Sequence, residues 1–426
     1  MWQRYRPRPL EIVDTTLREG QQTPLLHDHG KYFLTTEDKR DLLAALIRYG
    51  VKFIELFAPV VGPREAEDFV ALRQVRDELA PQYGYTFLLA HVRCHPRDVE
   101  AAVAAGFNGL NLYFGISPQS RAFNHRKDTE TIIYQSRALL EDLRREHPHL
   151  VLRFSGEDAF RTPLEDLFQV YDAVAPLVDR LGLPDTVGTA TPTQVAKRIQ
   201  ALRARYPDLP LEVHFHDDRG LALVNTLTAV RAGAQYVNTT LLGIGERSGI
   251  TSMTALLFNL FVDGDYDLVD GYRLRASYPI NVLAADKLRC LVPAKEPVSL
   301  TNRTHTAGVH QGAVLRHPTT YEAHPLELFG VDEREILLGP LSGWNVVHYF
   351  LREIHGFPVD EATAREITVR FKALASRISG DEPPAQLLLR LAREEFHLTP
   401  APPPPPQAPR LLPPPALGPR VQERIQ

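Results

Sequence analysis

Short apolar segments alternate with longer segments that repeat apolar residues at helical spacing through about the first 260 residues. The short segments have the length of buried strands, and the longer ones have the 3.6-residue period of amphipathic helices. The expected strands are Leu10–Thr15, Phe53–Phe57, Thr86–His91, Gly109–Phe114, Val151–Ser155, Arg180–Leu183, Leu211–His216 and Tyr236–Leu241. The expected helices are Glu37–Tyr49, Arg64–Leu79, Arg97–Ala105, Thr129–Glu146, Leu164–Val178, Thr193–Tyr206 and Leu221–Ala232.

Eight strands alternating with helices favour an α/β fold, a (β/α)8 TIM barrel. The alternative is a doubly wound open sheet, which usually has a glycine-rich phosphate-binding turn after its first strand. Here that turn is the polar and charged Leu17-Arg18-Glu19-Gly20. Polar residues also follow most of the expected strands, at the end of a barrel where catalytic groups gather. The barrel is therefore the preferred fold.

The pattern changes beyond the barrel, which is expected to occupy residues 1–263. Residues 264–330 are rich in loops and read as a linker subdomain. Residues 331–398 read as a helical C-terminal subdomain, with helices expected at Asp360–Ser379 and Pro384–Glu395. Residues 399–426 are rich in proline and predict an extended tail without a packed core.

Composition narrows the class of protein. The 426 residues carry a net charge of −4, so nothing favours nucleic acid or an anionic membrane as a partner. The two cysteines, Cys94 and Cys290, are not spaced for zinc or redox chemistry and indicate a reducing, cytoplasmic compartment. No signal peptide or transmembrane segment is evident.

His214 and His216 lie two residues apart in an expected strand and thus point to the same face. Two neutral imidazoles aimed at one point suit a divalent metal. Such a pair is by itself a weak signal, because it is about as common on a strand without any ligand. A distant second segment, Asp14-Thr-Thr-Leu-Arg-Glu-Gly-Gln, adds a carboxylate at the end of another strand. Together the two segments offer two histidines and one carboxylate, with open positions for a substrate.

Several motifs in order along the chain resemble the DRE-TIM metallolyase superfamily, in its branch of acyl-CoA-dependent Claisen condensing enzymes. Within that branch the chain resembles the homocitrate synthase family from about residue 10 to about residue 350. The motifs that carry the resemblance are Asp14–Gln21, His91–His95, Arg153–Asp158, Asp185–Gly188, His214–Asp217, Leu242–Thr251, Ala307–His310 and Ser342–Asn345.

The resemblance implies a divalent metal ion, Mg, Mn or Zn, bound by Glu19, His214 and His216. The metal would polarise the ketone of a bound 2-oxo acid, and the catalytic Arg18 would add a fixed positive charge beside the developing oxyanion. The positions that match the family's oxo-acid pocket are Gln22, Glu55, His91, Arg153, Ser155 and Thr186.

The resemblance also implies that acetyl-CoA is the co-substrate. A catalytic base set of Glu157, His310 and Tyr321 would remove a proton from its methyl group. In the family, the residues matching His310 and Tyr321 reach the barrel of the neighbouring subunit, so the resemblance implies a homodimer with a shared active site. The reaction implied is condensation of acetyl-CoA with 2-oxoglutarate and hydrolysis of the thioester to homocitrate and CoA.

Three positions depart from the family pattern and leave the identity of the oxo acid open. Asn111 stands where lysine-pathway members have aspartate, and Phe57 and Ala58 replace two small hydroxyl residues. The alternatives are oxaloacetate, pyruvate, 2-oxoisovalerate or phosphonopyruvate as substrate. A retro-aldol lyase on the same scaffold would not need the His310 and Tyr321 segment, and a non-catalytic scaffold would not keep all these groups together.

Overall fold

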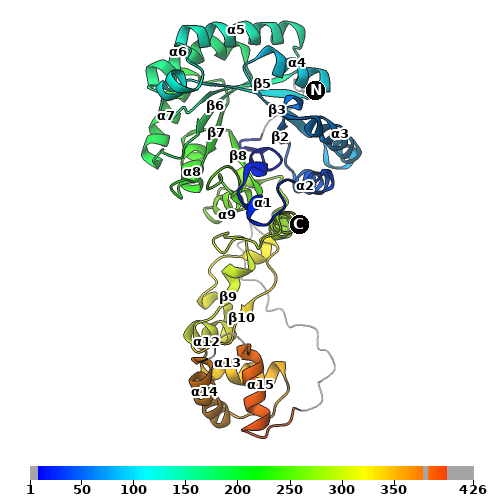
Figure 1. Ribbon diagram of the computed structural model, residues 1–426. Helices are drawn as coiled ribbons and strands as arrows, with labels where there is room; N and C mark the ends of the chain where they lie inside the picture. The colour runs from blue at the N-terminus through cyan, green and yellow to red at the C-terminus, as the bar shows by residue number, and fades with distance from the viewer. Residues whose placement is uncertain (1–7, 378–381, 401–426) are drawn as a thin grey trace. The chain divides into compact units, whose positions relative to one another are not determined.

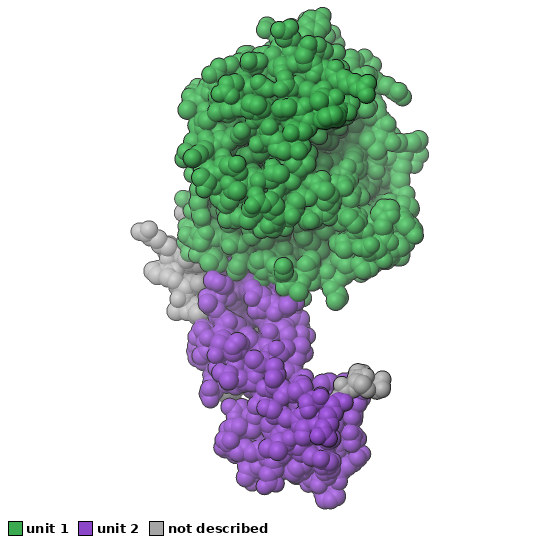
Figure 2. Space-filling model, turned by 60° about the vertical axis from the view of Figure 1, so that its left-hand side comes forward, with its two compact units in different colours: residues 1–298 green, residues 299–426 purple. Residues whose placement is uncertain are grey.

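The computed structural model of the protein describes residues 8–377 and 382–400. The chain divides into two compact units, residues 1–298 and 299–426, which are coloured separately in Figure 2. The proline-rich segment that the sequence predicts to be extended lies almost entirely outside the described residues. No helix among the described residues is both long enough and apolar enough to span a membrane.

The first unit is a closed barrel of eight parallel strands, which confirms the expected fold (Figure 1). The barrel closes where β1 pairs with β8, with Glu11 opposite Tyr236 and Asp14 opposite Thr239. The strands are β1 Glu11–Asp14, β2 Phe53–Phe57, β3 Phe87–Arg93, β4 Gly109–Gly115, β5 Val151–Glu157, β6 Arg180–Asp185, β7 Leu211–Phe215 and β8 Tyr236–Thr239.

Helices follow the strands and form the outer layer of the barrel in Figure 1. Two of them begin with a capping box in which a threonine side chain accepts the backbone N–H three residues on: Thr35 before α2 and Thr191 before α7. The main helices of the unit are α2 Thr36–Tyr49, α3 Pro63–Tyr83, α4 Pro96–Ala105, α5 Thr129–Glu146, α6 Leu164–Val174, α7 Pro192–Arg205, α8 Ala222–Ala232, α9 Met253–Val262 and α11 Ser277–Leu288.

The expected boundaries differ from the observed ones by a few residues, and two differences affect the site. Strand β5 continues to Glu157, two residues beyond the expected end, so Glu157 lies on the barrel rim. Strand β7 ends at Phe215, and His216 follows it, tied by one bridge to Ile250. The helix expected at Leu164–Val178 ends at Val174 and continues as a 3-10 turn.

The barrel interior is apolar in one layer and charged in the next. Apolar side chains from five strands pack together; they are Val13, Phe53, Phe87, Leu89, Val151 and Tyr236. The fully buried guanidinium of Arg180 lies 5.0 Å from the ring centre of Phe53 and 4.4 Å from that of Tyr236. It pairs with Glu212 at 3.2 Å. A buried charge must be compensated, and this layer supports the polar groups at the rim.

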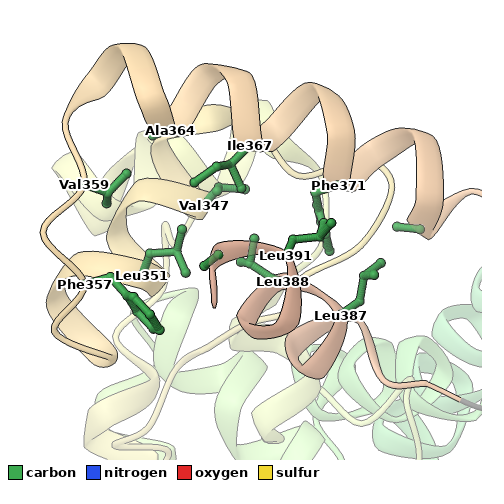
Figure 3. Close-up of a cluster of buried hydrophobic side chains, with 12 residues drawn as sticks. Val347, Leu351, Phe357, Val359, Ala364, Ile367, Phe371, Leu387, Leu388 and Leu391 are labelled. Atoms are coloured by element: carbon green, nitrogen blue, oxygen red, sulfur yellow. The ribbon is translucent and has the colours of Figure 1, made fainter. Parts of the chain in front are cut away.

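The second unit has its own core, formed mainly by α14 Glu361–Ala375 and α15 Pro384–Glu394 together with α13 Trp344–Tyr349 (Figure 3). Both α14 and α15 fall where the sequence predicts helices, although the expected end of the first, at residues 378–379, lies outside the described residues. Before them come α12 Gly308–Arg316 and a parallel pair of two-residue strands, β9 Thr304–His305 and β10 Glu335–Ile336. The structure groups residues 264–298 with the barrel.

Candidate active site

The carboxyl ends of the barrel strands surround a cavity of about 250 Å³. This volume is slightly below the usual range for ligand pockets and suits a small polar molecule. The sequence-predicted residues that line it are Arg18, Glu19, Gln22, His91, Arg153, Ser155, Glu157, Thr186, His214 and His216. Glu55 is fully buried below them and contacts Arg18 and Arg153.

Glu19, His214 and His216 form a group whose ligand atoms all lie within 4.8 Å of one another. The two imidazole Nε2 atoms are 3.2 Å apart. Asn238 donates its amide N–H to Glu212 at 2.8 Å, which turns its Oδ1 toward Nδ1 of His214 at 3.2 Å. The hydrogen of His214 is therefore on Nδ1, and its Nε2 lone pair faces His216. Two histidine nitrogens and a carboxylate at this separation fit a divalent cation.

The protonation states of the same three groups also suit a bound cation. Burial would raise the pKa of Glu19, but the Arg18 guanidinium and the two imidazoles outweigh it and lower that pKa to about 2. Burial and the neighbouring His216 lower the pKa of His214 to about 3. Burial also lowers the pKa of His216. The carboxylate is thus ionised and the imidazoles neutral near pH 7, the protonation states that metal binding requires.

Arg18 is held by two carboxylates on the cavity floor. Its Nε donates to Glu55 Oε1 at 2.8 Å, and its other side faces Glu19. Burial would raise the pKa of Glu55, but Arg18 and His91 keep it well below its ordinary value. Because Glu55 stays charged, it fixes the guanidinium plane of Arg18 next to the candidate metal ligands.

Arg153 lies across the cavity and is anchored in the same way. Its guanidinium pairs with Glu212 and lies 3.5 Å from Glu55. His91 contacts Glu55 at 3.5 Å and stacks on Tyr113, with ring centres 4.5 Å apart. Burial lowers the pKa of His91, so its imidazole is neutral. The cavity therefore offers two fixed cations and a neutral imidazole to an anionic ligand.

Glu157 occupies the rim of the cavity, at the end of β5. Burial, together with the adjacent Asp158, raises the pKa of Glu157 above its ordinary value. Asp158 has a left-handed backbone, with φ of 64°, and its carboxylate is bound by Arg161. A carboxylate with a raised pKa is a stronger proton acceptor than an ordinary glutamate.

The remaining two predicted residues, His310 and Tyr321, lie in the second unit. Their rings stack, with centres 3.9 Å apart and planes at 24°. His310 projects from α12, and Tyr321 precedes Glu322, whose carboxylate is bound by Arg303, Arg334 and His305. The structure thus brings these two side chains together on a supported segment.

Eight cavity-lining residues were not among the predicted site residues; they are Tyr113, Gly182, Leu183, Pro184, Glu212, Asn238, Glu246 and Arg247. Glu212 precedes His214 by two residues, so the same alternation that paired the histidines places its side chain on their face. Asn238 had no such signal, because its role depends on the pairing of β8 beside β7.

Comparison with known proteins agrees with this geometry. The family model described as HMGL-like matches residues 9–278, and the model described as homocitrate synthase post-HMGL domain-like matches residues 298–379. A mitochondrial homocitrate synthase from Schizosaccharomyces pombe is 34% identical over 87% of this chain and 85% of its own. A 2-isopropylmalate synthase from Methanocaldococcus jannaschii is 32% identical over 87% of this chain and 69% of its own.

Among solved structures, a hydroxymethylglutaryl-CoA lyase from Pseudomonas aeruginosa superimposes with a TM-score of 0.56 at 19% identity, covering 68% of this chain and 96% of that one. That likeness concerns the fold alone. The fold and the cavity define an enzyme built on an HMGL-like barrel of the DRE-TIM superfamily. Within that class the chain belongs to the homocitrate synthase family, whose members are acyltransferases.

Proposed function

We propose that the protein condenses acetyl-CoA with 2-oxoglutarate and hydrolyses the resulting thioester, which gives homocitrate and CoA. The observation that carries the proposal is the presence, in one cavity, of the Glu19, His214 and His216 group, two anchored arginines and a carboxylate with a raised pKa. These groups meet the two requirements of a Claisen condensation, a polarised ketone and a base for the methyl carbon.

Glu19, His214 and His216 hold the divalent metal, which supplies Lewis-acid polarisation of the ketone when bound. Arg18 places its guanidinium beside the developing oxyanion, and Glu55 keeps it there. Arg153 binds the distal carboxylate of the oxo acid. Gln22, His91, Ser155 and Thr186 line the same cavity and position the substrate.

Glu157 accepts the proton from the methyl group of acetyl-CoA. Its raised pKa helps because a thioester methyl group is a poor acid. His310 and Tyr321 complete the base set in the barrel of the neighbouring subunit of a homodimer. Their mutual stacking supports a shared role. The two cysteines are free thiols, which is consistent with a cytoplasmic enzyme.

A second candidate is the same reaction on another 2-oxo acid. It is favoured by Phe57, which ends β2 opposite the cavity-lining His91, and by the similar identity of the 2-isopropylmalate synthase relative. A retro-aldol lyase is a weaker candidate, because it has no need for the His310 and Tyr321 pair.

The decisive experiment is a screen of 2-oxo acids with acetyl-CoA that follows the release of free thiol. We expect 2-oxoglutarate to give the highest kcat/KM, with homocitrate identified by mass spectrometry. A preference for pyruvate, 2-oxoisovalerate or oxaloacetate would change the proposed substrate but leave the proposed type of reaction unchanged. Absence of thiol release with every oxo acid, in metal-loaded protein, would refute the proposed condensation.

A further inference from the structure

The guanidinium of Arg180, at the start of β6, is fully buried inside the barrel and does not line the candidate active site. Among the described residues, Glu212 is the only carboxylate with which Arg180 forms an ion pair, at 3.2 Å. No nitrogen of this side chain has a hydrogen-bond partner among those residues, and the rings of Phe53 and Tyr236 lie against it. Arg180 therefore acts in the barrel interior as a charge and not as a hydrogen-bond donor.

Arg180 is one end of a line of alternating charges that leads to the cavity. Glu212 pairs with Arg180 through one carboxylate oxygen and with Arg153 through the other. Arg153 lies 3.5 Å from Glu55, which in turn pairs with Arg18 at 2.7 Å. Each of these five side chains is at most 9% exposed. Because solvent screens buried charges weakly, a change at one end of the line alters the electrostatic field at the other.

The line carries more positive than negative charge. Three guanidinium groups face two carboxylates, which leaves one positive charge in excess. The Glu19 carboxylate lies outside this balance, because a divalent cation bound to it more than compensates its charge. Without Arg180, two guanidinium groups would face two carboxylates, and Glu212 would compensate Arg153 alone. Arg180 therefore supplies the excess charge, which Arg153 presents to the cavity.

We propose that Arg180 makes the site selective for 2-oxo acids that carry a second carboxylate. By compensating Glu212, it leaves the charge of Arg153 for the distal carboxylate of the substrate. Because Arg180 does not line the cavity, it is a positioning residue that acts through Glu212 and Arg153. The assignment rests on the proposed function, and it adds the residue that separates dianionic from monoanionic 2-oxo acids.

The test is calorimetric titration of the metal-loaded protein with 2-oxoglutarate and with 2-oxopentanoate. The second acid has the same carbon chain, with a methyl group in place of the distal carboxylate. The dianion preference is the Kd for 2-oxopentanoate divided by the Kd for 2-oxoglutarate. In Arg180→Met the Kd for 2-oxoglutarate should rise roughly tenfold, while that for 2-oxopentanoate should stay within about twofold, since this acid has no carboxylate to meet Arg153.

The opposite substitution should have the opposite effect. Glu212→Gln removes the compensating carboxylate but keeps an oxygen that can accept from Arg153 and Asn238, so the dianion preference should rise. The double variant Arg180→Met/Glu212→Gln removes both charges of a buried pair, so its preference should return to within about threefold of the wild-type value. A loss of packing alone would not raise the preference in one single variant and lower it in the other.

Two comparisons guard against variants that are merely unstable. If Arg180→Met does not fold, Glu212→Gln and the double variant still differ only at Arg180, and the double variant should show the lower dianion preference by roughly tenfold. Arg76→Met is the matched control, because Arg76 is a buried guanidinium on α3 that donates to Tyr85 at 2.8 Å and to Asn108 at 2.9 Å. This variant should lose thermal stability and keep the wild-type preference.

Three results overturn the assignment: a wild type that binds the two acids equally, a dianion preference that Arg180→Met leaves unchanged, or an equal preference in Glu212→Gln and the double variant. Release of free thiol from acetyl-CoA is measured separately. If the preference depends on Arg180 but 2-oxoglutarate gives no thiol release, the proposed condensation fails and the role of Arg180 stands. If thiol is released but the preference does not depend on Arg180, only this assignment fails.

Discussion

Three polar side chains of the cavity are each oriented by another charged or polar residue. Glu55 holds Arg18, Glu212 holds Arg153, and Asn238 sets the tautomer of His214. Groups fixed in this way need little reorganisation when a substrate binds, which is how a preorganised site stabilises charge. The geometry of the site therefore depends on Glu55, Glu212 and Asn238 as well as on the groups that they hold.

The metal ligands can be tested one at a time. His216→Ala removes one of three ligands, so we expect the protein to lose its metal on dialysis and turnover to disappear while the barrel stays folded. Asn238→Ala should weaken metal affinity by about 10–100-fold, the usual cost of losing the partner of a ligating histidine. Arg18→Ala should retain the metal and lose the chemical step. Metal content after dialysis, kcat and circular dichroism are the measurements; full metal retention with normal activity in His216→Ala would remove it from the ligand set.

Asp14 predicts a pH dependence of stability. Its side chain is fully buried, and although two hydrogen bonds from Thr16 oppose the effect, burial raises its pKa to about 7, against about 3.9 in an unfolded chain. Because the pKa of Asp14 is higher in the folded state than in the unfolded chain, Asp14 contributes most to the free energy of unfolding below about pH 4. That contribution is lost as the pH rises toward 7. The loss amounts to at most about 4 kcal/mol.

We therefore expect Asp14→Asn to gain stability relative to wild type between pH 5 and pH 8, measured as the free energy of unfolding in urea. Asp38→Asn is the control, because the pKa of Asp38 is lowered in the folded protein and not raised. Burial would raise the pKa of Asp38, but hydrogen bonds from Lys31 and Thr35 lower it, so its contribution changes only below about pH 4. Equal pH dependence for wild type and Asp14→Asn would contradict the assigned burial effect.

At the scale of the elements, two neighbouring strands approach so closely that the sequence of one restricts the other. Ser155 of β5 lies against Gly182 of β6, where an added Cβ would overlap the serine hydroxyl and stand 3.1 Å from its Cβ. The backbone of Gly182 also lines the cavity. The glycine is thus required for packing beside a predicted substrate ligand.

Gly182→Ala should displace Ser155, destabilise the protein by about 1–3 kcal/mol and raise the KM for the oxo acid. Ser155→Ala alone should raise that KM with little loss of stability. In the double variant the overlap with the hydroxyl is absent, so part of the stability should return. Thermal unfolding of the three variants measures this coupling. Strictly additive losses would show that the two side chains do not interact.

At the scale of the whole molecule, the proposed chemistry draws on both units of the chain. Glu157 belongs to the barrel, whereas His310 and Tyr321 belong to the unit that begins at residue 299. The second unit has its own hydrophobic core, formed by residues 347–392. If the active site is shared as proposed, dimerisation is a condition of activity.

Complementation tests the sharing. Arg18→Ala and His310→Ala should each be inactive alone. In a mixed dimer with exchanged segments, one site carries both lesions and the other carries neither, so co-expression of the two should restore part of the activity. Tagged subunits and tandem purification isolate the mixed species. Inactive hybrids, once the mixed dimer is shown to form, would mean that His310 acts within its own chain or has no catalytic role.

The sequence alone determined the class of fold and the identity of the candidate metal ligands. Strand Phe53–Phe57 and helix Thr129–Glu146 have the predicted bounds, because apolar period and flanking turn residues are local properties of the chain. The pairing of His214 with His216 is equally local, since the alternation of β7 continues into the residue that follows it and puts both on one face.

Only the tertiary structure decided how the charges of the site are balanced and what lies beside Glu157. Arg180 and Glu212 meet inside the barrel, and Asn238 reaches His214, because closure places β6, β7 and β8 side by side. The hollow that Glu157 and Lys127 both line likewise depends on the ends of three strands meeting one loop. Contacts of this kind join residues that are distant in sequence. The periodicity that identifies each strand therefore does not indicate which residues its side chains will contact.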